Sequence, residues 1–316
     1  MGGNRMKIRF TTPCIYKTGC TGEVCAGEGC ANDGAREFGC ASFGFAGAPD
    51  PAAEGERTWK GEIKGQAFFG TLEAVLAAIP EKCCIGTDAG NGCIGRPWQA
   101  GIVLFGNCGG ENDFIHALYE KTGCPLTGGA AACDPVSGAS GLVAGGSQAA
   151  VYMICDPDHE VRVESKNVHG NLLGVHKIGF TDPRVLDTID GEDAVLWYTE
   201  RREEYGFSAK DFEHMTLSDL NGVNAHMSMN GKRLVSGRDL CDEMILRYVD
   251  KGDVYPQMNT FYNDPNALVF GCAGLKGILE QDIMLDTMGM FMFGEVATMD
   301  GKPEFGNLML SKVVIE

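Results

Sequence analysis

The sequence predicts an α/β fold, and three observations lead to that prediction. Short apolar runs of strand length recur along the chain and end on glycine or a polar residue, as residues 267–270 end at Gly271. Segments with the apolar spacing of helices lie between these runs. The chain has 316 residues and 44% hydrophobic content, which is enough for one large domain or two. Sheets of this class bind ligands at their strand ends.

Residues 1–60 differ in composition from the rest of the chain and predict a loop-rich segment. Glycines and two prolines interrupt any apolar period, and five cysteines lie among the glycines: Cys14, Cys20, Cys25, Cys30 and Cys40. Closely spaced thiolates on a glycine-rich loop are able to converge on one iron–sulfur cluster or zinc ion. Because no C-x-x-C pair is present, the alternative is a loop of reduced cysteines that pack as small hydrophobes.

Residues 61–160 show a regular alternation of elements. Leu72, Val75 and Ile79 lie on one face of a helix expected over residues 68–79, which ends at Pro80. Further expected elements are a strand over 100–105, a helix over 112–121 and a strand over 148–155. Gly128 and Gly129 follow a short apolar segment, as turn-forming glycines do.

Residues 161–316 begin with an expected strand near 161–163. The Asp190-Gly191 turn then precedes a helix that starts near Ala194. Residues 239–249 have apolar side chains on one broad face and predict an amphipathic helix. Three strands are expected in the last fifty residues, over 267–270, 288–293 and 308–315.

Small or polar residues adjoin these last three strands. Cys272 and Gly274 follow the first strand, Glu295 follows the second, and Asn307 precedes the third. A carboxylate and an amide at the end of a sheet suit an ammonium or hydroxyl group, and backbone N–H groups suit a carboxylate. The sequence therefore predicts a small-ligand pocket at this edge.

Cys272 also raises the possibility of a cysteine-dependent enzyme. A thiolate nucleophile needs a base or a positive neighbour, and no histidine follows His226 in the sequence. The competing interpretation is a small residue packed beneath a strand-end loop. The sequence alone assigns no catalytic residue.

Several short motifs resemble the FIST domain, a sensory domain family. In the C-terminal half they are F-G-C-A-G at 270–274, G-E-V at 294–296 and G-N at 306–307, and Leu275 stands where the family usually has arginine. In the N-terminal half they are I-G-T-D-A-G at 85–90 and G-G-A-A at 128–131. The resemblance covers about residues 65–316. It implies a two-lobed α/β sandwich with mixed sheets, halves at 61–160 and 161–316, and strand-end loops that form a shared pocket.

The resemblance also implies a function. It indicates an intracellular sensor that binds a small, amino-acid-like ligand and passes the signal to a separate protein, such as a histidine kinase or a chemoreceptor. The ligand-binding residues it suggests are Cys272, Gly274, Glu295, Asn307, Gly128, Gly129 and Arg184. Because some family members bind haem through a histidine, a haem-binding sensor is an alternative, although no histidine here matches that ligand position. A redox protein that uses the N-terminal cysteines is the other alternative.

Charge and composition narrow the classes of partner. The net charge of −17 disfavours nucleic acid and acidic membrane surfaces as partners. No apolar run is long enough for a transmembrane helix, and the first residues lack the apolar core of a signal peptide. Fourteen cysteines in such a chain suit a reducing compartment, so we expect a cytoplasmic protein.

Overall fold

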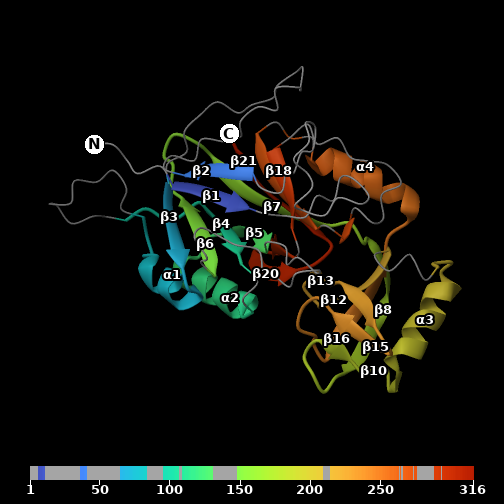
Figure 1. The fold of residues 1–316 in the computed structure, drawn as a ribbon. Coiled ribbons are helices and arrows are strands. Elements are labelled where there is room, and N and C mark those ends of the chain that lie inside the picture. The colour runs from blue at the N-terminus through green and yellow to red at the C-terminus, as the bar shows by residue number, and fades with distance from the viewer. Residues whose placement is uncertain are drawn as a thin grey trace.

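The structure is a computed structural model. It describes residues 6–10, 36–40, 65–83, 95–106, 109–130, 148–208, 214–262, 264, 266–272, 274–275, 288–292 and 294–316. These residues form an α/β fold with mixed and antiparallel sheets, so the predicted fold class is confirmed. Two lobes are visible in Figure 1: a layered body that carries β3–β7 and the C-terminal strands, and a smaller lobe around β8, β12 and β16.

The larger sheet of the layered body has six strands in the order β20-β19-β5-β4-β6-β3. Their bounds are β3 (Gly65–Gly70), β4 (Ala100–Phe105), β5 (Leu126–Ala130), β6 (Ala149–Ile154), β19 (Glu295–Met299) and β20 (Lys302–Gly306). Only β4 and β5 pair in parallel within this sheet. The last part of the chain therefore completes a sheet that the first part begins.

Helices α1 (Leu72–Ala78) and α2 (Glu111–Thr122) pack on this sheet. Thr71 caps α1, because its side-chain oxygen accepts a hydrogen bond from the Ala74 N–H at 3.2 Å. Edge-to-face contacts join Phe105 of β4 to Phe114 of α2 and to Phe305 of β20, with ring centroids 5.7 and 6.0 Å apart.

A four-stranded sheet, in the order β18-β17-β21-β7, stacks on the first sheet. Its strands are β7 (Val161–Asn167), β17 (Ala267–Cys272), β18 (Met288–Met292) and β21 (Met309–Ile315). The Thr127 and Ser311 hydroxyls hydrogen-bond between the sheets at 2.6 Å, and the Ser165 hydroxyl lies 3.1 Å from that of Ser311. Helix α4 (Lys251–Tyr262) packs on this second sheet through Val254 and Met258. Figure 1 shows α1 and α2 on one side of the body and α4 on the other.

The smaller lobe is built on a six-stranded sheet, in the order β11-β10-β8-β16-β12-β13, and a three-stranded sheet, in the order β14-β15-β9. Helix α3 (Ala194–Glu204) packs on it. The strands are β8 (Asn171–Gly179), β9 (Val185–Leu186), β10 (Thr188–Ile189), β11 (Glu192–Asp193), β12 (Met215–Ser218), β13 (Asn224–Ala225), β14 (Met227–Asn230), β15 (Arg233–Ser236) and β16 (Glu243–Tyr248).

Most of the expected elements are confirmed, and the helix expected over 239–249 is wrong. That segment contains strand β16, which pairs with β8 and β12. Met244 and Leu246 are buried, whereas Glu243 is exposed, so burial follows the two-residue period of a strand. The helix expected from residue 68 begins at Leu72, because Gly65–Gly70 forms β3.

The N-terminal segment contains two strands, β1 (Met6–Phe10) and β2 (Arg36–Cys40), which pair antiparallel. The sequence analysis did not predict these two strands in the loop-rich segment. Cys40 ends β2 opposite Met6, while Cys14, Cys20, Cys25 and Cys30 lie outside the described residues. The motif at 85–90 lies outside them as well. None of the helices in the described part of the chain is long and apolar enough to cross a membrane.

Candidate functional site

Glu295 and Cys272 meet inside the layered body, at the ends of two strands in different sheets. Glu295 is the first residue of β19, opposite Gly129 of β5 and Gly306 of β20, and Cys272 is the last residue of β17. The Glu295 residue is 0% exposed and Cys272 is 5% exposed. The thiol of Cys272 hydrogen-bonds to the carboxyl group of Glu295. We call these two side chains the buried pair.

The backbone between β20 and β21 aims N–H groups at the buried pair. Leu308 adopts a left-handed conformation with φ of 54°, which costs about 1 kcal/mol for a residue with a Cβ. The N–H groups of Leu308 and Gly274 point at the Cys272 sulfur. The next N–H, of Met309, donates to Glu295 Oε2 at 3.3 Å. The strained residue thus directs two consecutive donors toward the pair.

Burial controls the protonation of both groups. Loss of hydration raises the pKa of Glu295 well above its usual range, although the Met309 N–H, the Cys272 thiol and the Gly294 N–H each favour the ionised form. Burial, and then the charge of a Glu295 carboxylate, raise the pKa of the Cys272 thiol well above its usual range. Burial therefore favours the carboxylic acid and the thiol over their ionised forms. A protonated thiol is a weak nucleophile.

The second oxygen of the Glu295 carboxyl group is unsatisfied. Among the described residues, Oε1 has no hydrogen-bond partner, although it is fully buried. A buried oxygen without a hydrogen bond destabilises the folded protein by about 1–3 kcal/mol relative to one that is hydrogen-bonded. Most buried polar atoms in native proteins have a hydrogen-bond partner. When Glu295 is ionised, Oε1 is therefore a position at which a hydrogen-bond donor from a ligand would be favourable.

Gly128 and Gly129 let strand β5 lie close to the strand end that carries Glu295. Gly128 has φ of 128°, and a Cβ on it would lie 1.9 Å from the carbonyl oxygen of Val103. A Cβ on Gly129 would lie 2.4 Å from the carbonyl oxygen of Gly294. Because these glycines have no side chain, β5 approaches Gly294 closely enough for the Ala130 N–H to donate to the Gly294 carbonyl oxygen at 2.9 Å. Gly294 directly precedes Glu295 in the sequence.

Asn307 and Arg184 lie apart from the buried pair. The Asn307 side chain faces the smaller lobe, where its Oδ1 accepts a hydrogen bond from His226 N–H at 3.3 Å. Arg184 Nε lies 2.9 Å from Asp239 Oδ1, and this ion pair is exposed. Leu275 is fully buried in the core beneath α4, at the position where an arginine is expected by resemblance. The structure thus brings together Cys272, Gly274, Glu295, Gly128 and Gly129, and places Asn307 and Arg184 elsewhere.

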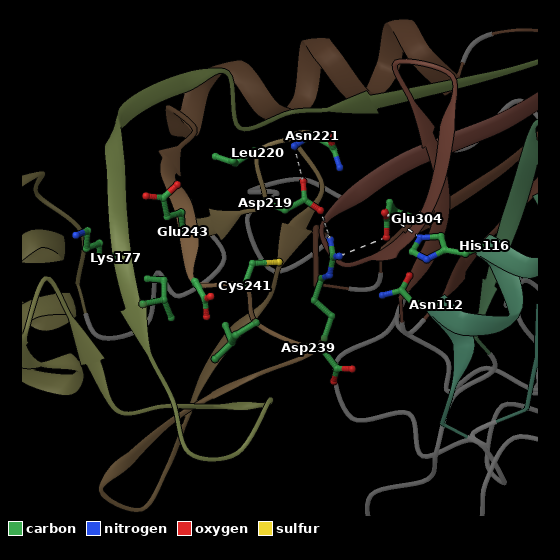
Figure 2. A pocket seen from close by; sticks show the side chains of 14 residues that line it. Asn112, His116, Lys177, Asp219, Leu220, Asn221, Asp239, Cys241, Glu243 and Glu304 are labelled. Carbon is green, nitrogen blue, oxygen red and sulfur yellow. Dashed lines mark hydrogen bonds and ion pairs between the residues drawn. The ribbon is translucent and has the colours of Figure 1, made fainter.

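Sequence reasoning missed a cavity between the two lobes. Its volume is about 860 Å³, and it is lined by α2 and β20 on one side and by the ends of β8, β12, β15 and β16 on the other. Figure 2 shows Asn112, His116 and Glu304 on one wall and Lys177 and Glu243 on the opposite wall. We call this space the interlobe cavity.

A buried arginine, Arg238, lines the interlobe cavity. The Arg238 side chain is 5% exposed, and its Nη1 donates to Asp219 Oδ2 at 2.9 Å. Its Nη2 lies 3.6 Å from Glu304 Oε2, and the other Glu304 oxygen lies 2.9 Å from His116 Nε2. The dashed lines of Figure 2 follow this chain of contacts from one lobe to the other. The Asp219-Leu220-Asn221-Gly222 turn is the one local signal in the sequence, because Asp219 Oδ1 accepts from the Asn221 N–H at 2.9 Å.

No protein-family model matches this sequence, and a comparison with curated proteins gives no match either. Within the described residues, no group of three or more His, Cys, Asp or Glu side chains is arranged to hold a metal ion. The proposed ligands Cys14, Cys20, Cys25 and Cys30 are not among those residues.

Proposed function

We propose that this chain is a cytoplasmic sensor that binds a small amine-bearing molecule, such as an amino acid, at Glu295. The observation that carries the proposal is the fully buried carboxyl group with one unsatisfied oxygen. An ammonium group supplies the missing N–H donor and also a positive charge. Hydrogen bonds between an ammonium group and a carboxylate are roughly twice as strong as those between neutral groups.

Proton release follows from this mode of binding. Because burial raises the pKa of Glu295, the free protein favours the neutral acid, whereas an ammonium ligand favours the carboxylate. The ligand therefore displaces one proton, and its affinity rises with pH until the pH reaches the pKa of Glu295 in the free protein. The slope is up to about tenfold per pH unit, since one proton is exchanged.

The motif resemblance to the FIST domain supports a sensory role. F-G-C-A-G and G-E-V, the two motifs that contain the buried pair, are among the residues that carry the resemblance. In this proposal ligand binding changes the strained Leu308 segment, which directs its N–H groups at the pair. The signal then passes to a separate signalling protein, such as a histidine kinase or a chemoreceptor.

A cysteine-dependent enzyme is less well supported by the geometry. Two backbone N–H groups at the Cys272 sulfur would stabilise a thiolate, but burial and Glu295 together raise the thiol pKa. We assign no catalytic residue. The N-terminal iron–sulfur or zinc hypothesis, and the haem alternative, are tested together by metal analysis and an absorption spectrum of protein purified without oxygen.

A thermal-shift screen tests the proposed function. The twenty amino acids and short primary amines are added at pH 7.5 to the wild type, to Glu295→Gln and to the control Glu192→Gln, whose side chain is exposed in β11. A ligand at about one hundred times its dissociation constant stabilises the folded state by about 2.7 kcal/mol. We expect a shift in the wild type and the control that is lost in Glu295→Gln. No shift with any compound, or an equal shift in Glu295→Gln, contradicts the proposal.

A further inference from the structure

We propose that the interlobe cavity is a second ligand site, and that it takes a small polar cation that also carries acceptor oxygens, of the amino-sugar or amino-alcohol class. The cavity is lined by residues of both lobes and contains neither Glu295 nor Cys272. This inference is therefore independent of the function proposed for the buried pair.

Arg238 supplies the first argument, because its guanidinium group is buried but incompletely paired. Nη1 and Nη2 face Asp219 and Glu304, whereas Nε has no hydrogen-bond partner among the described residues. A buried N–H group needs an acceptor, and Arg238 lines the cavity, so a ligand is able to supply that acceptor. The flanking carboxylates of Asp219 and Glu304 would repel an anion. They favour a neutral oxygen, such as that of a hydroxyl group.

The charge of the lining supplies the second argument. Among the described residues, five carboxylates line the cavity (Asp219, Asp239, Asp242, Glu243 and Glu304) against two cationic side chains, Lys177 and Arg238. A cleft with one predominant sign of charge concentrates ligands of the opposite sign. Arg238 already faces two of these carboxylates, and Arg184 pairs with Asp239. Asp242 and Glu243 have no ion pair within the described part of the chain, which leaves them to face an ammonium group.

The size and the remaining polar groups agree with a hydroxylated ligand. A volume of about 860 Å³ falls within the usual range of small-molecule sites. Asn112 uses its Oδ1 to accept from Phe305 N–H at 2.7 Å, so its NH₂ group is the part able to donate to a ligand oxygen. Asn221 adds a second amide to the lining. Apart from His116, the described residues of the lining include no aromatic side chain, which favours hydroxyl groups over an apolar ring.

Calorimetric titration of the full chain with glucosamine, at pH 7 and low salt, tests this proposal. Glucose lacks the positive charge and putrescine lacks the acceptor oxygens, so both should bind more weakly than glucosamine. In the double variant Asp242→Asn/Glu243→Gln the affinity for glucosamine should fall about fivefold, as expected for the loss of two exposed charge pairs. The control Glu192→Gln/Glu203→Gln removes the same charge from exposed positions of the same lobe and should bind as the wild type does.

Three results would overturn the proposal. They are the absence of glucosamine binding, unchanged affinity in the Asp242→Asn/Glu243→Gln variant, and putrescine or glucose binding as tightly as glucosamine. The Glu295→Gln variant should keep its glucosamine affinity. Loss of binding there would assign glucosamine to the buried pair and remove the second site. Matching thermal unfolding of the double variant and the wild type shows that any loss does not come from misfolding.

Discussion

The protonated state of Glu295 makes the stability of this protein depend on pH in a predictable direction. In the unfolded chain a glutamate has a pKa of about 4.3, whereas burial raises the pKa of Glu295 in the folded protein. Between this unfolded pKa and the raised folded pKa, the folded state therefore binds more protons than the unfolded state. Stability contributed by this group is present at low pH and is lost as the pH rises toward the folded pKa.

The Glu295→Gln variant removes this proton while it keeps an oxygen for the Met309 N–H. One bound proton changes the free energy of unfolding by about 1.4 kcal/mol per pH unit. As the pH rises from 5 toward the folded pKa of Glu295, the wild type should therefore lose stability relative to Glu295→Gln by up to this amount per pH unit. Cys272 does not contribute to this difference, because its thiol is protonated in both states over this range.

Urea unfolding under reducing conditions measures the effect. Trp98 and Trp197 are buried in the layered body and in the smaller lobe, so tryptophan fluorescence reports the unfolding of each. The control Glu192→Gln should follow the wild type at every pH, because Glu192 is exposed. A difference between wild type and Glu295→Gln that stays constant from pH 5 to pH 7 would refute the argument that Glu295 is neutral in the folded protein.

Two further predictions concern the walls of the site. Gly128→Ala should cost more than about 3 kcal/mol, because its Cβ would overlap the Val103 carbonyl, whereas Gly123→Ala, with φ of 67° and open space around it, should cost about 1 kcal/mol. Equal losses in denaturant unfolding would show that the close approach is unimportant. Iodoacetamide at pH 7 should modify the exposed Cys241 well before the buried Cys272, as followed by peptide mass spectrometry. Equal rates would instead support Cys272 as a reactive thiol.

The strand of Cys272 and its neighbours β18 and β21 could be predicted from the sequence because their signals are local, whereas β19, which begins at Glu295, was not predicted. Continuous apolar runs gave β17, β18 and β21, and the glycines and polar residues beside them indicated a site. The sequence contains no comparable signal for the left-handed Leu308, since leucine rarely adopts that conformation. That conformation depends on how β20 and β21 pack in two different sheets.

The wrong helix over residues 239–249 and the missed interlobe cavity have a common physical cause. Both depend on contacts between residues that are far apart in the sequence. Residues 239–249 contain apolar side chains that fit a helical face and also the alternation of a strand, and pairing with β8 and β12 selected the strand. At the interlobe cavity, Arg238 of the smaller lobe contacts Glu304 of the layered body and forms an ion pair with Asp219 of its own lobe. No spacing in the sequence relates these three residues, so the cavity could be found only from the fold.

Proton release on ligand binding tests the central claim, that Glu295 anchors an ammonium group, most directly. The tightest-binding amine from the thermal-shift screen is titrated calorimetrically at pH 6 in two buffers that differ in ionisation enthalpy. We predict that the wild type and Glu192→Gln release protons when the ligand binds, because burial raises the pKa of Glu295 in the free protein. Glu295→Gln should release none. Binding without proton release in the wild type, or equal release from Glu295→Gln, would contradict the account.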